Sequence, residues 1–335
     1  MKQNTLLTLL FFYATLMSAQ TVFVNPTATG DNDGSSWANA YANLQDALDD
    51  ANATDVWIAA GTYSTATIGS DSLATYYIGS QLNLYGGFAG TETSLADRDF
   101  NTNSTVLTGD INGDDVADDF ENNRSDNSFH ILYIDSLLTE PIVIDGINFQ
   151  GGQASTNTNS FLLNRSGGGI ISLSPVAIRN CSFTNNAAFA GGGIYLLMGA
   201  SGSVVENCAF TGNLAISQSA GLMLNTLTNI QINNCSFSDN VTNRGVLYPL
   251  FSDNVTVSDC EFLNNTNLNG FSAGIFNWQS TNFRVSNCIF DNNVALNGGA
   301  IFANGSQIGA VDPDNYVIDN CTFTNNRATD FGGGA

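Results

Sequence analysis

The segment best suited to chemistry is an acidic stretch, DINGDDVADDFE, at residues 110–121. Its oxygen-bearing side chains follow the spacing of ligands in twelve-residue calcium loops: Asp110, Asn112, Asp114, Asp118 and Glu121. The sixth position, usually glycine in such loops, is Asp115, and no amphipathic helices flank the stretch. The segment therefore predicts either a calcium site or a solvated acidic loop inserted between structural elements.

Six cysteines are the second candidate for chemistry, and each lies in a repeated unit. The units read NCSFTNN (180–186), NCAFTGN (207–213), NCSFSDN (234–240), DCEFLNN (259–265), NCIFDNN (287–293) and NCTFTNN (320–326). Steps between the cysteines are 27, 27, 25, 28 and 33 residues, and a weaker copy, DGINFQGG (145–152), has Ile147 in place of cysteine. Self-similarity at this period indicates a solenoid or an array.

Each unit predicts two short strands that meet at a bend. Val176 and Ile178 alternate as residues on one face of a strand do, but the step from Ile178 to Cys181 is three and breaks the alternation. The residue before the cysteine is Asn or Asp in every copy, and these types tolerate the left-handed backbone conformation: Asn180, Asn207, Asn234, Asp259, Asn287 and Asn320. We therefore expect a tight corner at this position in every unit.

A third short strand is expected after each glycine cluster, as in Gly193-Ile194-Tyr195. Three short strands in each repeat, with no helical period between them, predict an all-β fold, a right-handed parallel β-helix. The alternative is a β-sandwich of antiparallel hairpins. It would not place the same residue type at the same phase six times.

Stacking of coils about 4.8 Å apart would arrange equivalent residues in rows along the axis. That separation exceeds the roughly 3.8 Å between the Cβ atoms of a disulfide, so we expect buried free thiols. Zinc is disfavoured because His130 is the only histidine and a row of thiols is not tetrahedral. Three structural rows are expected: Cys181, Cys208, Cys235, Cys260, Cys288 and Cys321; Phe183, Phe210, Phe237, Phe262, Phe290 and Phe323; Asn186, Asn213, Asn240, Asn265, Asn293 and Asn326.

The N-terminal residues 1–20 have the pattern of a secretory signal peptide. Lys2 supplies the charge, residues 6–16 the apolar core, and Ser18-Ala19 the small residues near a cleavage point. A buried helix is the alternative. No later apolar run is long enough for a transmembrane helix. We therefore expect a secreted or cell-surface protein, associated with the outer membrane.

The remaining chain divides into three regions. Residues 21–60 are expected to form an N-terminal cap and the first rung, 61–145 irregular early coils with the acidic insertion, and 146–335 regular coils. A helix is predicted after Ser35-Ser36, because Trp37, Tyr41, Leu44 and Leu48 would share one helical face. Its aromatic stripe is interpreted as core, with sugar stacking as the alternative. Val56-Trp57-Ile58 is the expected first rung. The chain ends where another strand would begin, so we expect a longer protein, truncated at its C-terminus.

The repeat resembles that of the chlamydial polymorphic outer membrane proteins, which carry paired FxxN and GGAI tetrapeptides. FxxN is intact in all six units, and GGAI is literal at residues 298–301 and relaxed elsewhere, as in GGGI at 191–194. The resemblance covers about residues 145–335. It implies a surface-displayed β-helix with a role in adhesion.

Net charge and the scarcity of bases restrict the function further. The formal charge is −22 and Lys2 is the only lysine, so nucleic acid and anionic lipid are unsuitable partners. A polysaccharide lyase or hydrolase would need converging carboxylates or a calcium-carboxylate cluster with a base. Neither set is evident around the four arginines of the repeat region, which are Arg179, Arg244, Arg284 and Arg327. His130 is interpreted as structural.

These observations favour a non-enzymatic adhesin or interaction scaffold whose partner is an extracellular glycan or protein. The alternative is a pectate-lyase-like, polysaccharide-active enzyme or a carbohydrate-binding protein. Apart from calcium at the acidic stretch, no cofactor is expected.

Overall fold

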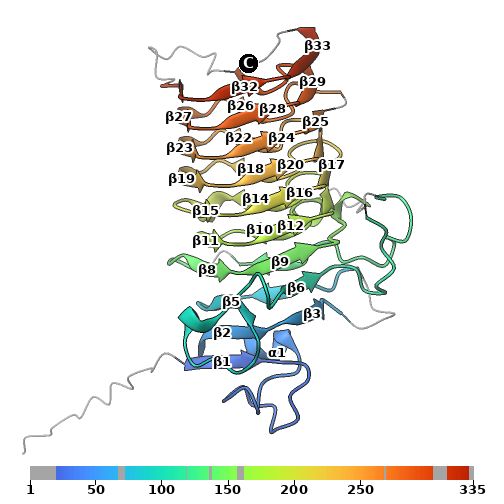
Figure 1. The fold of residues 1–335 in the computed structure, drawn as a ribbon, viewed down its shortest axis with the longest axis vertical. Helices are drawn as coiled ribbons and strands as arrows, with labels where there is room; N and C mark the ends of the chain where they lie inside the picture. Colours follow the sequence, from blue (N-terminus) through green and yellow to red (C-terminus); the bar gives the residue numbers. More distant parts are fainter. Residues whose placement is uncertain are drawn as a thin grey trace, which may run out of the picture.

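The computed structural model describes residues 20–66, 72–117, 119–135, 138–156, 162–267, 269–304 and 315–331. Short strands wind into a single column, from the N-terminal end in blue to the C-terminal end in red (Figure 1). The expected signal segment lies almost wholly outside the described residues, which begin at Gln20.

Every paired strand of the described chain runs parallel to its neighbour, and the strands form four sheets. One coil passes through the sheets in turn, so we number them in that order. Sheet 1 contains β1 (Gln20–Val24), β2 (Ala53–Ala59), β5 (Asn83–Phe88), β8 (Ile142–Asp145), β11 (Val176–Arg179), β15 (Val204–Glu206), β19 (Thr228–Asn233), β23 (Asp253–Ser258), β27 (Thr281–Ser286) and β31 (Val317–Asp319).

Sheet 2 follows sheet 1 after the corner in each coil. It contains β3 (Gly61–Ser64), β6 (Thr105–Thr108), β9 (Ile147–Gln150), β12 (Ser182–Thr184), β16 (Ala209–Thr211), β20 (Ser236–Ser238), β24 (Glu261–Leu263), β28 (Ile289–Asp291) and β32 (Thr322–Thr324). Sheet 3 is shorter and contains β13 (Ala187–Ala188), β17 (Leu214–Ala215), β21 (Val241–Thr242), β25 (Thr266–Asn267), β29 (Val294–Asn297) and β33 (Arg327–Phe331).

Sheet 4 closes each coil. It contains β4 (Tyr76–Ile78), β7 (Leu132–Ile134), β10 (Ile170–Ser172), β14 (Ile194–Leu197), β18 (Leu222–Asn225), β22 (Leu247–Leu250), β26 (Ile275–Trp278) and β30 (Ile301–Asn304). Short 3₁₀ turns lie in the connections: η1 (Leu95–Asp97), η2 (Ala154–Thr156), η3 (Leu162–Arg165) and η4 (Met198–Ala200). The predicted parallel β-helix is therefore confirmed.

Corners between sheets 1 and 2 adopt the conformation expected from the sequence. The Asn or Asp before each cysteine has a φ between +49° and +56°. A second corner, between sheets 2 and 3, uses the same chemistry, and Asn185 there has a φ of +53°. The prediction of three strands per coil was wrong because this second corner starts a fourth. Most sheet 3 strands have only two residues, too few to show an alternating pattern.

The N-terminal cap differs from the expected helix. The helix α1 (Leu44–Leu48) has five residues and is capped by Asn43, whose side chain accepts a hydrogen bond from the Gln45 backbone N–H. Trp37 precedes the helix, and its indole Nε1 donates to the Glu92 carbonyl over 2.9 Å. Sheet 1 also begins one strand before the expected Val56–Ile58 rung, since β1 pairs in parallel with β2. The cap is therefore mostly turns, with α1 packed against β1, β2 and β4.

No helix in the described part of the chain combines the length and apolar character needed to cross a membrane.

Candidate functional site

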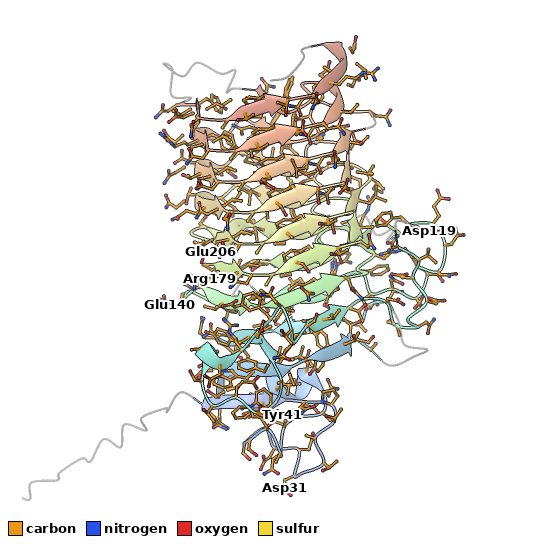
Figure 2. All side chains as sticks on the ribbon, in the orientation of Figure 1. Asp31, Tyr41, Asp119, Glu140, Arg179 and Glu206 are labelled. Carbon is orange, nitrogen blue, oxygen red and sulfur yellow. The ribbon has the colours of Figure 1, made fainter. Side chains whose placement is uncertain are left out.

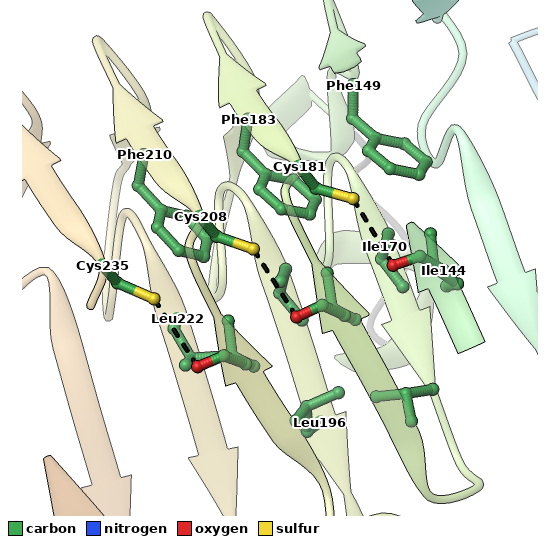
Figure 3. Close-up of a cluster of buried hydrophobic side chains, with 14 of the residues drawn as sticks. Ile144, Phe149, Ile170, Cys181, Phe183, Leu196, Cys208, Phe210, Leu222 and Cys235 are labelled. Atoms are coloured by element: carbon green, nitrogen blue, oxygen red, sulfur yellow. Dashed lines mark hydrogen bonds between the residues drawn. The ribbon is translucent and has the colours of Figure 1, made fainter. Parts of the chain in front are cut away.

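The interior of the coils is built from stacked rows of identical residues. Phenylalanine rings from Phe149 to Phe323 stack with centroid separations of 4.6–5.1 Å and interplanar angles of 3–10°. Figure 3 shows Phe149, Phe183 and Phe210 in one file beside Cys181, Cys208 and Cys235. Consecutive coils are therefore in register, and every outward-facing position is repeated along the axis in the same way.

All six cysteines are free thiols, and only Cys321 is not buried. Each sulfur donates to the carbonyl two residues before it, as Cys181 Sγ does to Arg179 over 3.0 Å. A second, longer contact reaches a carbonyl of the preceding coil, from Cys208 Sγ to Ile178 O over 3.6 Å. Because their sulfurs face the core, these cysteines pack there as small apolar side chains.

The Asn of each FxxN motif forms a buried hydrogen-bonded row. Asn213 is fully buried, and its Oδ1 accepts from the Asn186 backbone N–H over 3.0 Å. Its Nδ2 donates to the Phe183 carbonyl over 2.9 Å and to Asn240 Oδ1 over 3.0 Å. The same pattern continues from Asn186 to Asn326. The row satisfies backbone groups that the corner between sheets 2 and 3 removes from strand pairing.

On the surface, the corner between sheets 1 and 2 is hollowed into a groove of about 480 Å³. Corner residues and the first outward residues of sheet 2 line it, and Phe100 and Asn101 lie at one end. We call this the corner groove; its polar lining includes Asn148, Asn180, Ser182, Asn207, Asn234, Ser236, Asp259 and Glu261. No Arg, Lys or His is among its lining residues.

The corner amides are hydrogen-bonded to one another along the axis. Asn234 Nδ2 donates to Asn207 Oδ1 over 2.8 Å, and Asn180 Nδ2 donates to Asp145 Oδ1 over 2.8 Å. Each primary amide has two N–H donors and an oxygen with two lone pairs, so one bond along the row leaves further capacity. The groove therefore presents fixed amide donors and acceptors at the interval of the coils, together with the carboxylates of Asp259 and Glu261.

The acidic stretch forms a loop on the side of the column. Carboxylate oxygens of Asp110, Asp114 and Asp126 all lie within 4.8 Å of one another. Asp110 Oδ1 also accepts from the Gly113 and Asp114 backbone N–H groups, over 2.7 and 3.2 Å. Asp126 Oδ2 accepts from the Asn112 backbone N–H over 3.0 Å. The cluster thus unites two predicted ligands with Asp126, which the twelve-residue spacing did not include.

The other predicted ligands are placed differently. Asn112 contacts the cluster through its backbone, whereas Asp118 lies outside the described residues. Glu121 is exposed, and its backbone N–H belongs to a turn closed by Asp119 Oδ1. Figure 2 shows Asp119 at the outer edge of this loop. The five predicted ligands therefore do not converge on one site, because the last turn of the loop points away from the column.

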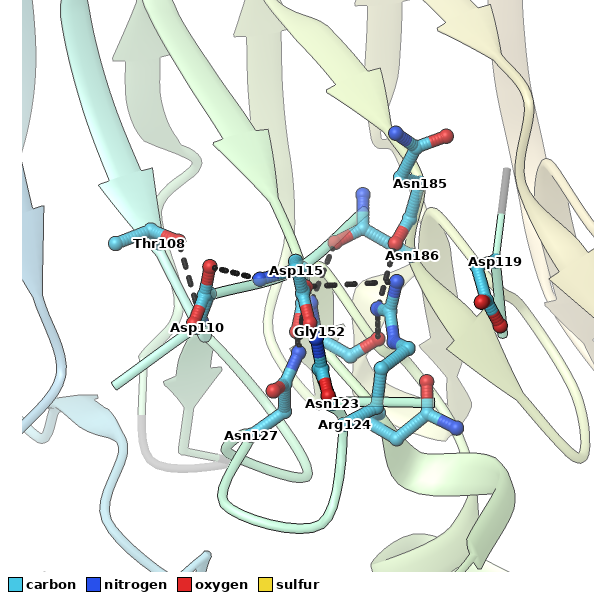
Figure 4. Close-up of polar contacts among 12 residues, drawn as sticks. Thr108, Asp110, Asp115, Asp119, Asn123, Arg124, Asn127, Gly152, Asn185 and Asn186 are labelled. Carbon is cyan, nitrogen blue, oxygen red and sulfur yellow. Dashed lines mark hydrogen bonds and ion pairs between the residues drawn. The ribbon is translucent and has the colours of Figure 1, made fainter. Parts of the chain in front are cut away.

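A buried ion pair anchors the same loop. Arg124 Nη1 lies 3.5 Å from Asp115 Oδ2, and Arg124 Nη2 donates to the Asn185 carbonyl over 2.8 Å (Figure 4). Burial raises the pKa of the Asp115 carboxyl to about 6 and lowers the pKa of the Arg124 guanidinium. Asn127 Nδ2 donates to Asp115 Oδ2 over 2.8 Å. Arg124 is therefore held inside the loop as a structural cation.

Two further arginines gather around one carboxylate on sheet 1: Arg98 Nη2 lies 2.5 Å from Asp145 Oδ2, and strand register places Arg179 beside Asp145. Arg179 Nε lies 2.5 Å from Glu206 Oε1 on the next coil, and Figure 2 places both side chains at one edge of sheet 1. Arg284 pairs with Asp319 over 3.2 Å, so Arg179 and Arg284 each have an acidic partner that the sequence did not reveal. His130 precedes β7 rather than lying within a strand. Its Nδ1 is 3.1 Å from the Gly167 carbonyl, and burial lowers its pKa to about 4.

Sheet 4 has an apolar outer face that the sequence analysis missed. One outward row is buried, from Ile171 through Tyr195 to Phe276, and packs with a second row that includes Leu250 and Trp278. The signal was available in runs such as GIYLLMG (193–199) and VLYPLF (246–251), where both alternating positions are apolar. Such runs indicate a strand covered on both faces.

Stacked parallel strands, inward residue rows and a cornered cross-section define the molecule as a right-handed parallel β-helix. A family model described as "Right handed beta helix region" matches residues 120–290, just over half of the chain. The chain therefore belongs to the right-handed beta helix family.

Among solved structures, the crystal structure of pectate lyase Pel9A is similar in fold. Its TM-score is 0.51 at 11% sequence identity, covering 95% of this chain and 80% of that chain. No curated protein sequence matches this chain. Identity this low extends the likeness to the fold alone.

Proposed function

We propose that this protein is an exported, surface-displayed β-helix that binds a neutral extracellular glycan in the corner groove and does not cleave it. The observation that carries the proposal is the lining of the groove: amides and hydroxyls repeated along the axis, with no cationic side chain. Sugar hydroxyls both donate and accept hydrogen bonds, and amides match both roles. A volume of about 480 Å³ lies within the usual range for small-ligand sites.

The composition of the groove argues against catalysis. Its two carboxylates, Asp259 and Glu261, are two residues apart in sequence, and no basic side chain faces them from the lining. Among the described residues, Arg124 is buried among acids of its own loop, and Arg98 and Arg179 are each held in an ion pair on sheet 1, with Asp145 and Glu206. A polysaccharide-active enzyme remains the alternative, since the similar solved structure is named a pectate lyase.

Export and surface display are supported by the sequence. The N-terminal pattern of Lys2 and the apolar residues 6–16 is that of a signal peptide, and the FxxN repeat resembles surface proteins implicated in adhesion. We expect N-terminal sequencing of the exported protein to begin near residue 20. Protease treatment of intact cells should remove it from the surface; full protection from protease would contradict surface display.

Groove binding can be tested with two matched pairs of substitutions. Asn207→Gly with Asn234→Gly removes two groove amides, and glycine accepts their φ values of +54° and +49°. The control, Asn229→Gly with Asn254→Gly, removes an equally exposed amide pair with φ values of +59° and +53° at the far edge of sheet 1.

The full chain is titrated with neutral oligosaccharides chosen from a glycan array, using calorimetry. We expect the groove pair to weaken binding at least about tenfold and the control pair to leave it unchanged. Equal effects of the two pairs would refute the groove as the site. New reducing ends or unsaturated products from any polysaccharide would refute the absence of catalysis.

Calcium at the acidic loop is the second part of the proposal, favoured by the carboxylate cluster. Asp110, Asp114 and Asp126 offer the hard oxygen ligands that Ca²⁺ prefers. Two further oxygens, Asp115 Oδ1 and Asn127 Oδ1, are buried without a hydrogen-bond partner in this loop. The donor chemistry therefore fits, and a bound cation would offset the repulsion among these acids.

A further inference from the structure

An apolar stripe on the surface follows the corner between sheets 4 and 1, remote in each coil from the corner groove. Met198 and Phe251 are the corner residues of their coils and are 72% and 51% exposed. They adjoin the half-buried outer row of sheet 4. We define the apolar stripe as Leu173, Leu197, Met198, Leu250, Phe251 and Trp278. Strand register places these residues on the coils of β10, β14, β22 and β26, with Asn225 and Thr226 at the equivalent positions of the β18 coil between them.

Backbone conformation gives no reason for large apolar residues at this corner. Met198 and Phe251 have φ values of +46° and +50°, a region that bulky side chains adopt at a cost in free energy. Thr226 and Gln279 take the same conformation on the coils between and beyond. At the other two corners, positive φ is met by Asn, Asp or Gly. Asn, Asp or Gly would therefore adopt this conformation at a lower cost in free energy than the Met and Phe that these coils carry.

Burial gives no reason either. Side chains so exposed remain in water, and exposed apolar residues gathered along one side of a soluble protein mark interaction sites. The outward row of the adjoining sheet 1 is polar on the later coils, with Gln231, Thr256 and Arg284, whereas Ala177 and Val204 occupy it on the earlier coils. The stripe is thus a local departure in conformation and, on the coil of Phe251, also in polarity.

We propose that the apolar stripe docks a segment of another protein that carries apolar side chains with basic residues beside them. Leucine and methionine dominate the stripe, and these aliphatic groups suit apolar protein side chains better than sugar hydroxyls. The chain has a formal charge of −22, and Asp253 lies two residues after Phe251, so a cationic flank is attracted. A second copy of the chain or an anionic membrane carries like charge and is repelled.

Substitution by asparagine separates binding from folding. Met198→Asn with Phe251→Asn removes the apolar groups and installs the residue that the other corners use for positive φ. Thr226→Asn with Gln279→Asn is the matched control, since it relieves the same conformation without removing a large apolar side chain. Both pairs should raise the melting temperature of the full chain or leave it unchanged.

The probe is a fluorescein-labelled peptide of alternating leucine and lysine, titrated with the full chain and followed by anisotropy. We expect saturable binding, weakened at least about tenfold by Met198→Asn with Phe251→Asn and unchanged by the control pair. An asparagine–lysine peptide and a leucine–glutamate peptide should both bind at least about tenfold more weakly.

Four results would overturn the proposal. They are equal binding by the two variant pairs, equal binding of the asparagine–lysine peptide, equal binding of the leucine–glutamate peptide, and a lower melting temperature for the Met198→Asn and Phe251→Asn pair. The last would assign the apolar groups to folding. Sedimentation that shows a dimer dispersed by this pair would replace the proposed partner with a second copy.

Discussion

Removing one amide from the buried asparagine row should destabilise the whole column. In Asn213→Ala, the Asn186 backbone N–H loses its acceptor at 3.0 Å, and the Phe183 carbonyl loses a donor at 2.9 Å. Water cannot replace either group, because Asn186, Asn213 and Phe183 have no exposed surface.

The magnitude follows from these lost contacts. An orphaned buried N–H costs about 1–3 kcal/mol, and a lost hydrogen bond to a carbonyl about 1 kcal/mol. We therefore expect Asn213→Ala to lower the free energy of unfolding by about 3 kcal/mol, a large part of the roughly 5–15 kcal/mol typical of a domain. Asn326→Ala is the control. Asn326 makes equivalent bonds to Asn293 and Phe290, but its own side chain is partly exposed, so water can enter the space that it leaves and bond to those groups at a cost of about 1 kcal/mol.

Urea unfolding followed by circular dichroism measures both variants. If Asn213→Ala costs less than about 1 kcal/mol, or no more than Asn326→Ala, the row does not contribute through buried hydrogen bonds and the reasoning fails.

Three further predictions concern titratable groups. Without reductant, a thiol reagent should label six cysteines in the denatured protein and at most Cys321 in the folded protein. Fewer than six labelled cysteines after denaturation would indicate disulfides. The folded pKa of His130, about 4, is below the ordinary 6.5, so its contribution to stability is complete above pH 6.5 and is lost as pH falls towards 4. Measured by urea unfolding, the free energy of unfolding of the wild type should fall by up to about 3 kcal/mol more between pH 7.5 and 4.5 than that of His130→Gln. An equal fall in the two proteins would contradict this prediction. Calcium should raise the melting temperature of the wild type but not of Asp126→Asn, and a melting temperature unmoved by chelator would dismiss the site.

The parallel β-helix was predictable because the repeat constrains conformation as well as composition. An Asn or Asp in phase with a break in alternation indicates a left-handed corner, and Asn180 has that conformation. Sheet 3 was missed because a strand such as Ala187–Ala188 carries no alternation. The cap helix was overestimated because Trp37 and Tyr41 have helical spacing but pack in turns against strands.

The sites were less predictable because they depend on neighbours in space. Asp126 joins Asp110 across a turn that no fixed loop spacing anticipates. The acidic partner of Arg179 is Glu206, one coil away, which the sequence alone could not pair without knowing the register. The corner groove likewise arises only when corner residues from successive coils are brought together.

The register between coils, which the parallel phenylalanine rings show, determines how such a molecule can change its length. Intervals between equivalent cysteines range from 25 to 33 residues, so the connecting loops absorb differences that the strands do not. A duplication or loss of one complete unit would keep every row continuous and alter the reach of the column by about 4.8 Å. A single-residue insertion within a strand such as β16 would instead turn its core side chains towards solvent.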